Sequence, residues 1–100
     1  MIGYTSEELG HVFEAVVGSQ LVRLGLPLYY WRDGKNEVDF VLKNGRSVYA
    51  IEVKSAKKKK QSGMAAFKKL NPKSLCLFID QENYCEFEHN PLKFIKGHAV

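Results

Sequence analysis

EVDFVLKNGRSVYAIEVKS, at residues 37–55, contains two apolar runs that alternate with polar residues and meet at Asn44-Gly45. This dipeptide predicts a β-hairpin, because both of its residues tolerate the positive φ of a type I′ turn. With Asn44 and Gly45 as the two loop residues, Lys43 faces Arg46. That pairing sets the register of the whole hairpin.

The predicted register gathers acidic side chains on one face. We expect Asp39 opposite Ala50 and Glu37 opposite Glu52. Opposed residues share a face and diagonal neighbours on it lie about 7–8 Å apart, so Lys54 joins these acids. Because like charges that face each other destabilise a sheet, three carboxylates gathered here suggest that a cation belongs between them.

The other face of the hairpin is apolar and is predicted to be core. Its members are Val38, Phe40 and Leu42 on the first strand and Ser47, Tyr49, Ile51 and Val53 on the second. A slip of one residue would expose all of them. Burial of this face therefore fixes the register, in addition to the turn.

Length and composition indicate a single domain over residues 1–100, large enough for one core. No run approaches the ~20 apolar residues of a membrane span, and no signal-peptide pattern is present, so we expect a cytoplasmic protein without a membrane partner. Cys76 and Cys85 lack CxxC or metal-ligand spacing, which favours two reduced thiols over a disulfide. The spacing of the histidines suggests no zinc site.

The net charge of +4 hides an asymmetry along the chain. Between Val53 and Ile79 there is no acidic residue but there are eight lysines, and four of these are consecutive: Lys57, Lys58, Lys59 and Lys60. A phosphate-bearing partner such as DNA is the natural inference, with these four lysines as its binding residues. A solvated loop that keeps the chain soluble explains the same run equally well.

Apolar periodicity predicts the other elements. A helix capped by Ser6 ends at Gly25, and a shorter helix begins at Gly63. Strands are expected at 28–32, 37–43, 46–54, 75–79 (buried on both faces) and 84–88, and a terminal turn or short helix at 91–96. The aromatic residues Tyr29, Tyr30 and Trp31 are expected in the core rather than stacked on bases.

The resulting order, α-β-β-β-α-β, predicts an α/β fold of the α+β type. Short turns make the first three strands antiparallel neighbours. The helical crossover that follows suits a parallel return to the sheet. We therefore expect a central mixed sheet flanked by helices.

Asp39 and Glu52 also match a chemical requirement. Mg²⁺ takes oxygen ligands, typically one or two carboxylates, and keeps waters and a substrate phosphate. Lys54 projects to the same face and could stabilise charge that builds on a phosphate. Acid-x-Lys patterns are common on exposed strands, but the second acid and the nearby lysines strengthen this one, and together they suggest phosphodiester hydrolysis.

Several segments together resemble the PD-(D/E)XK nuclease superfamily, whose restriction-endonuclease-like core has the same α-β-β-β-α-β order. More closely, the chain is similar to the uncharacterised C-terminal domain that many prokaryotic AAA+-type ATPases carry. The similarity covers roughly residues 9–79 and rests on Phe13-Glu14, Tyr29-Tyr30-Trp31-Arg32, Glu37-Val38-Asp39-Phe40-Val41 and Ile51-Glu52-Val53-Lys54-Ser55.

The resemblance implies a role for five residues. Asp39 and Glu52 would be ligands of Mg²⁺ or Mn²⁺, together with the backbone carbonyl of Val53. Lys54 would be the catalytic lysine. Glu14 would be an additional acid that completes the site, although helix geometry alone favours a solvated boundary residue there.

Two residues depart from this pattern or add to it. Val38 stands where the superfamily's name has proline. Glu37 is an extra carboxylate that could pair with Lys54 or Arg32 and make the cluster a salt-bridged surface. The chain also contains no G-x-x-x-x-G-K-[ST] phosphate loop and is therefore not the ATPase itself. The resemblance implies that it is a fragment of a longer ATPase chain.

Three functions stay open at this point. The first is a metal-dependent nuclease domain that acts on DNA. The second is a catalytically inactive nuclease-like module that binds nucleic acid or the ATPase without cutting. The third is a structural or oligomerisation domain, with a homodimer among its forms. Metal affinity and DNA cleavage would separate them.

Overall fold

The computed structural model describes residues 6–54 and 63–100, and the lysines predicted to bind nucleic acid, Lys57–Lys60, lie outside the described residues. Its helices are α1 (Ser6–Val22), α2 (Met64–Leu70), α3 (Tyr84–His89) and α4 (Pro91–His98). Its strands are β1 (Leu28–Asp33), β2 (Asn36–Asn44), β3 (Ser47–Val53) and β4 (Leu75–Ile79).

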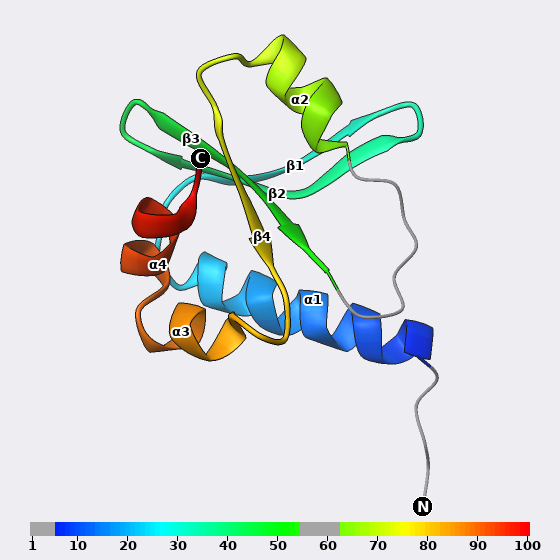
Figure 1. The fold of residues 1–100 in the computed structure, drawn as a ribbon, viewed down its shortest axis with the longest axis vertical. Coiled ribbons are helices and arrows are strands. Elements are labelled where there is room, and N and C mark those ends of the chain that lie inside the picture. The colour runs from blue at the N-terminus through cyan, green and yellow to red at the C-terminus, as the bar shows by residue number, and fades with distance from the viewer. Residues whose placement is uncertain (1–5, 55–62) are drawn as a thin grey trace, which may run out of the picture.

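The four strands form one mixed sheet in the order β1-β2-β3-β4 (Figure 1). The pairs β1–β2 and β2–β3 are antiparallel, and β4 is parallel to β3. The predicted α-β-β-β-α-β order and the mixed sheet are therefore confirmed. Within residues 6–54 and 63–100, no helix has the length and apolar character that crossing a membrane requires.

The hairpin between β2 and β3 turns one residue later than predicted. Asn44 pairs with Ser47, so Gly45 and Arg46 are the loop residues. Gly45 has a φ of 61°, and among the described residues only glycines have positive φ. This φ pattern fits a type II′ turn, in which glycine takes the first loop position, and it spares Asn44 the positive φ that a type I′ turn demands.

The register predicted for this hairpin is consequently wrong by two residues. Val41, and not Asp39, pairs with Ala50. A shift of two residues preserves the face of a side chain but changes the residue opposite it. Asp39 is thereby moved two positions along β3, toward Glu52.

A β-bulge interrupts β2 between Val38 and Val41. On β1 the partners of these two residues, Trp31 and Tyr29, are only two positions apart. One residue of β1 therefore faces two residues of β2, Asp39 and Phe40.

The bulge puts Val38 and Phe40 on different faces of the sheet. The prediction that Val38 shares a core face with Phe40 and Leu42 is therefore wrong, because Val38 packs with Val41 on the α2 side. The ring of Phe40 points to α1, where a Cβ added at Gly18 would lie 2.9 Å from the ring's Cζ.

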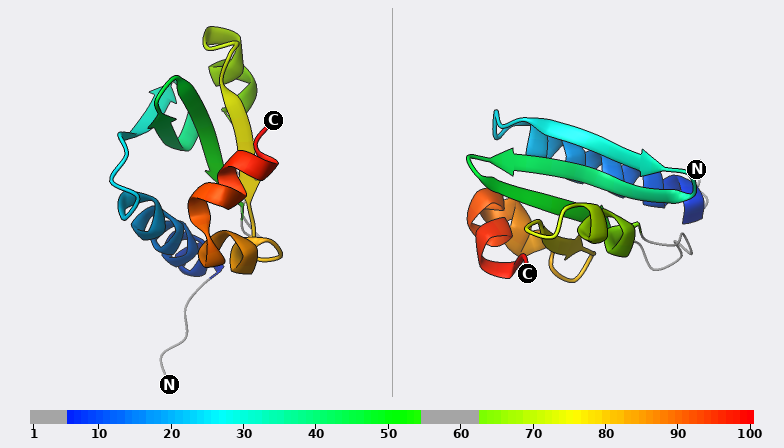
Figure 2. Two further views of the ribbon diagram at one scale, coloured as in Figure 1. Left: turned by 90° about the vertical axis from the view of Figure 1, so that its left-hand side faces the viewer. Right: turned by 90° about the horizontal axis from the view of Figure 1, so that it is seen from above.

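Two apolar clusters cover the two faces of the sheet. The larger cluster joins the sheet to α1, α3 and α4, and its most buried members include Val17, Leu21, Leu42, Ile51, Ile79, Phe87 and Ile95. The smaller cluster lies under α2 and consists of Val38, Val41, Ala50, Met64 and Phe67. Figure 2 shows the same division, with α2 on one side of the sheet and α1 and α3 on the other. The predicted polar face is thus half covered by a second core.

The segment predicted as a fifth strand, Tyr84–Glu88, is the helix α3 instead. A turn before it holds Asp80 and Asn83 together, since the backbone N–H of each donates to the side-chain oxygen of the other. Phe87 is fully buried in the larger cluster, three residues after the half-buried Tyr84. Helical spacing thus explains the weak alternation better than a strand does. The predicted short helix at the end is confirmed as α4.

Two predicted burials are wrong. β4 is not buried on both faces, because Phe78 is 39% exposed. Tyr29 and Tyr30 on β1 are exposed as well, and only Trp31 is half-buried, packing edge-on against Phe67. Edge strands of a sheet have one neighbour only, and both β1 and β4 are edge strands. As predicted, the two cysteines are free thiols.

Gly63, just before α2, provides a test of how this helix is docked. Its N–H donates to the carbonyl oxygen of Glu37 at 2.9 Å, and an added Cβ would lie 2.5 Å from the backbone N and O of Glu37. Gly63→Ala should therefore lower the free energy of unfolding by about 1–3 kcal/mol, the usual cost of overpacking. Chemical denaturation measures this change.

The control is Gly97→Ala in α4, where an added Cβ meets nothing within 4 Å. That change should be neutral or stabilising, because alanine is the better helix former. Equal effects at the two glycines would contradict the close approach of α2 to β2.

Candidate functional site

The candidate site lies where β2 and β3 separate. The pairs between these strands run from Asn44–Ser47 to Phe40–Ile51. One step beyond the last pair, Asp39 comes opposite Glu52. Both side chains are buried, with exposed fractions of 3% and 4%.

Asp39 is held in place by the main chain of β3. Its Oδ2 accepts a hydrogen bond of 2.8 Å from the N–H of Val53. The β2–β3 pairs end at Phe40–Ile51, and beyond them the Asp39 carboxylate, and not a backbone carbonyl, accepts the hydrogen bond from Val53. The carboxylate is therefore fixed beside the residue that follows Glu52.

Glu52 adds a second buried carboxylate. It pairs with Phe78 in the parallel β3–β4 ladder. Oε1 of Glu52 and Oδ1 of Asp39 are both buried atoms. Burial of two neighbouring carboxylates is costly unless hydrogen bonds or a cation compensate, so this pair marks the least expected feature of an otherwise apolar sheet.

Lys54 follows at the exposed end of β3. Its N–H donates to the carbonyl oxygen of Ile79 at 2.8 Å, which fixes the backbone, while its side chain is exposed. Alternation along β3 directs this side chain to the same face as Glu52. Its Nζ lies 4.3 Å from the ring centroid of Phe78.

Glu37 does not belong to this group. Its partner on β1 is Arg32, and Oε1 of Glu37 lies 3.5 Å from Nε of Arg32. The predicted opposition of Glu37 and Glu52 is wrong, because it depended on the incorrect hairpin register. Of the two pairings left open for Glu37, the one with Arg32 is found.

Glu14 is half-buried on α1. Among the described residues there is no group of three or more His, Cys, Asp or Glu side chains that could hold a metal ion. The structure thus brings Asp39 and Glu52 together with Lys54 and Val53, but it does not gather Glu14 with the two acids as a third metal-binding side chain.

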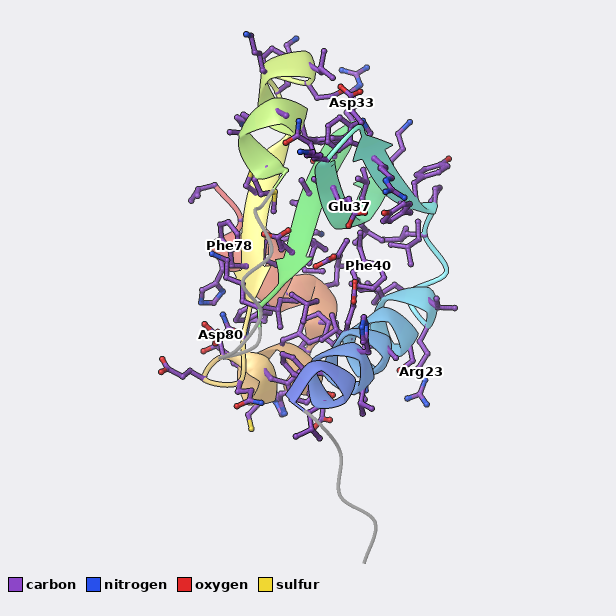
Figure 3. All side chains as sticks on the ribbon, turned by 90° about the vertical axis from the view of Figure 1, so that its right-hand side faces the viewer. Arg23, Asp33, Glu37, Phe40, Phe78 and Asp80 are labelled. Carbon is purple, nitrogen blue, oxygen red and sulfur yellow. The ribbon has the colours of Figure 1, made fainter. Side chains whose placement is uncertain are left out.

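Figure 3 shows the surroundings of the site. Glu37 and Phe40 are labelled on β2, and Phe78 is labelled on β4, which lies on the other side of β3. The sequence predicts that Phe78 is a core residue. In the structure, its ring lies beneath the ammonium of Lys54. The parallel return of β4 beside β3 would have placed Phe78 near Glu52, but only a known register could have shown it.

The donor set suits a hard cation. Carboxylate and carbonyl oxygens are the ligands that Mg²⁺ prefers, and one or two carboxylates suffice when water and a substrate phosphate complete the shell. Because N–H and C=O of one strand residue point to the same side, the carbonyl of Val53 is directed toward Asp39 as well. The residues present therefore fit a divalent cation held by two carboxylates and one carbonyl.

Comparison with known proteins gives one match. A family model described as "Domain of unknown function (DUF4143)" matches residues 9–95. No curated protein and no solved structure matches the chain.

The Asp39–Val53 hydrogen bond can be tested without the complication of charge. Asp39→Asn and Asp39→Ala both remove the carboxylate, but only asparagine keeps an oxygen that accepts from the N–H of Val53. Asp39→Ala should be less stable than Asp39→Asn by about 1–3 kcal/mol, the cost of a buried donor left without an acceptor. Urea denaturation of both variants measures the difference. Equal stability of the two variants would show that this hydrogen bond does not hold the bulge.

Proposed function

This chain belongs to the DUF4143 family, and we propose that it is a nuclease-like domain that binds a divalent cation, Mg²⁺ or Mn²⁺, and acts on DNA phosphodiesters. The observation that supports the proposal most is the burial of Asp39 and Glu52 side by side, next to an exposed lysine. Two neighbouring carboxylates repel each other, and a bound cation relieves that repulsion.

Each residue of the site has a distinct part in this proposal. Asp39 and Glu52 hold the cation, with the carbonyl of Val53 as a third ligand. Lys54 presents its ammonium to an oxygen of the phosphate and stabilises the negative charge that develops there. When bound, the cation polarises the phosphate and lowers the pKa of a coordinated water.

The resemblance to PD-(D/E)XK nucleases supports the same set of residues. The similarity to the C-terminal domain of AAA+-type ATPases supports the further proposal that this domain follows an ATPase module in a longer chain. The full-length reading frame tests that second point directly. A frame without an upstream ATPase module would contradict it and would leave the cation site untouched.

A second candidate function is a module of the same fold that binds nucleic acid or protein without cutting. A cleavage assay separates the candidates. Hydrolysis of DNA that requires Mg²⁺ and is strongly reduced, though still measurable, in Lys54→Ala, but kept in Lys43→Ala, supports the nuclease. Binding without hydrolysis supports the module.

The cation should raise the melting temperature of the wild type, because it binds the folded state only. At a concentration of about 100 times Kd the stabilisation is roughly 2.7 kcal/mol. Asp39→Asn should melt slightly higher than the wild type without cation, because carboxylate repulsion is relieved, and should gain nothing when Mg²⁺ or Mn²⁺ is added. Melting curves with and without cation measure both effects.

Asp33→Asn is the matched control, because it removes an exposed carboxylate at the end of β1. It should keep the full shift caused by the cation. A shift of equal size in Asp39→Asn would place the cation elsewhere on the protein.

DNA affinity should depend on Lys57, Lys58, Lys59 and Lys60. Each phosphate contact releases counterions and contributes a slope of roughly −0.9 to log affinity against log salt on duplex DNA. Replacing all four lysines by serine should weaken binding uniformly across sequences and flatten the salt dependence. Titrations at several salt concentrations measure the slope. An unchanged slope would show that these four lysines do not bind DNA and would favour a solubilising role for them.

A further inference from the structure

The ammonium of Lys54 lies over an aromatic ring and not beside a carboxylate. Its Nζ is 4.3 Å from the ring centroid of Phe78, well inside the range of about 6 Å over which a ring attracts a cation. Glu37, the acid that could have taken this lysine, pairs with Arg32 instead.

The backbone fixes both ends of the Lys54–Phe78 contact. Phe78 is the partner of Glu52 in the β3–β4 ladder, and Ile79 is the partner of Val53. The N–H of Lys54 continues this ladder by donating to the carbonyl of Ile79. Lysine and ring therefore start from neighbouring strands at a separation that the ladder sets.

The exposure of Phe78 agrees with this arrangement. A phenylalanine in the middle of a strand is commonly buried, yet Phe78 is 39% exposed, and β4 is an edge strand. The side chain is therefore only partly buried there. What it offers at this position is a flat, negatively polarised face under an ammonium group.

We propose that Phe78 is a positioning residue that holds the ammonium of Lys54 over the face of the sheet on which Glu52 lies. The inference deepens the proposed function, since it rests on Lys54 as the residue that meets the phosphate. Without the ring, the four-carbon side chain of Lys54 is free to swing into solvent, because no other contact of its ammonium is found among the described residues.

A ring suits this task better than a carboxylate does. A carboxylate beside Lys54 would neutralise its charge and occupy its N–H donors. A ring attracts the cation through its face and leaves N–H groups free to donate to phosphate oxygens. Phe78 thus orients the charge without reducing what Lys54 presents to a phosphate.

The first measurement needs neither metal nor DNA. Protons above an aromatic ring resonate upfield, so the ε-methylene protons of Lys54 should appear upfield of those of the other lysines in NMR spectra of the wild type. Phe78→Leu should abolish this displacement, and Phe78→Tyr, which keeps the ring, should preserve it. Lys43, whose Nζ is 6.0 Å from the ring of Tyr29, is the internal comparison and should show a smaller displacement.

The second measurement is a double-mutant cycle on Mg²⁺-dependent DNA hydrolysis. Phe78→Leu should lower kcat about two- to fivefold, as expected for one exposed cation–ring contact, and leave KM unchanged. Phe78→Tyr should restore kcat. In a Lys54→Ala background Phe78→Leu should have no further effect. Tyr29→Leu, which removes the exposed ring under Lys43 on the other edge strand, should change none of these values.

The outcomes separate this inference from the proposed function. Ordinary shifts for the Lys54 ε-protons in the wild type overturn the positioning role, whatever the activity, and this holds even if Phe78→Leu does not fold. An upfield displacement that depends on the ring, in a protein that does not cleave DNA, supports the positioning of Lys54 and contradicts the nuclease. An effect of Phe78→Leu that persists without Lys54 overturns the inference as well.

Discussion

The β-bulge in β2 is the constraint on which the site depends. It admits one extra residue opposite β1, turns Phe40 toward α1 and leaves Val38 under α2. The carboxylate of Asp39, between them, accepts a hydrogen bond from the N–H of Val53. Asp39 is one of the two residues of β2 that face a single residue of β1 there. The bulge therefore lies at the point where a carboxylate of β2 meets the backbone of β3.

Burying these acids works against stability, and the surrounding sheet is built to tolerate it. Two carboxylates within one hairpin repel each other and lose water. The sheet carries apolar clusters on both faces, and the first residue before α2 approaches the backbone of β2 closely enough to exclude any side chain at Gly63. Stability supplied by these contacts allows an unfavourable pair of charges to persist. This pair is the basis of the cation site that we propose.

The amino-acid sequence contained most of the fold but only part of the site. Periodicity predicted α1, α2 and the four strands of the sheet, because apolar spacing reflects which face is buried, but it took α3 for a fifth strand. The hairpin register was missed by two residues, since Asn44-Gly45 satisfies one turn type and Gly45-Arg46 another, and composition does not choose between them. The bulge could not be predicted either, because the segment of β2 that contains it has no glycine or proline to indicate an irregular strand. The contact between Phe78 and Lys54 could not be predicted, because it depends on how β4 pairs with β3.

The parallel pairing of β3 with β4 has a consequence for how the site assembles. Asp39 and Val53 are 14 residues apart within one hairpin, a local element that forms in about 1–10 μs. Lys54 and Phe78 meet only after a crossover through α2 has closed, and such non-local pairing is the slower event. The contact of Asp39 with β3 and the contact of Lys54 with Phe78 therefore form at different stages of folding. A chain in which β4 has separated from β3 would retain its acidic pair while losing the ring beneath Lys54, so local opening at this edge would separate the two parts of the proposed site.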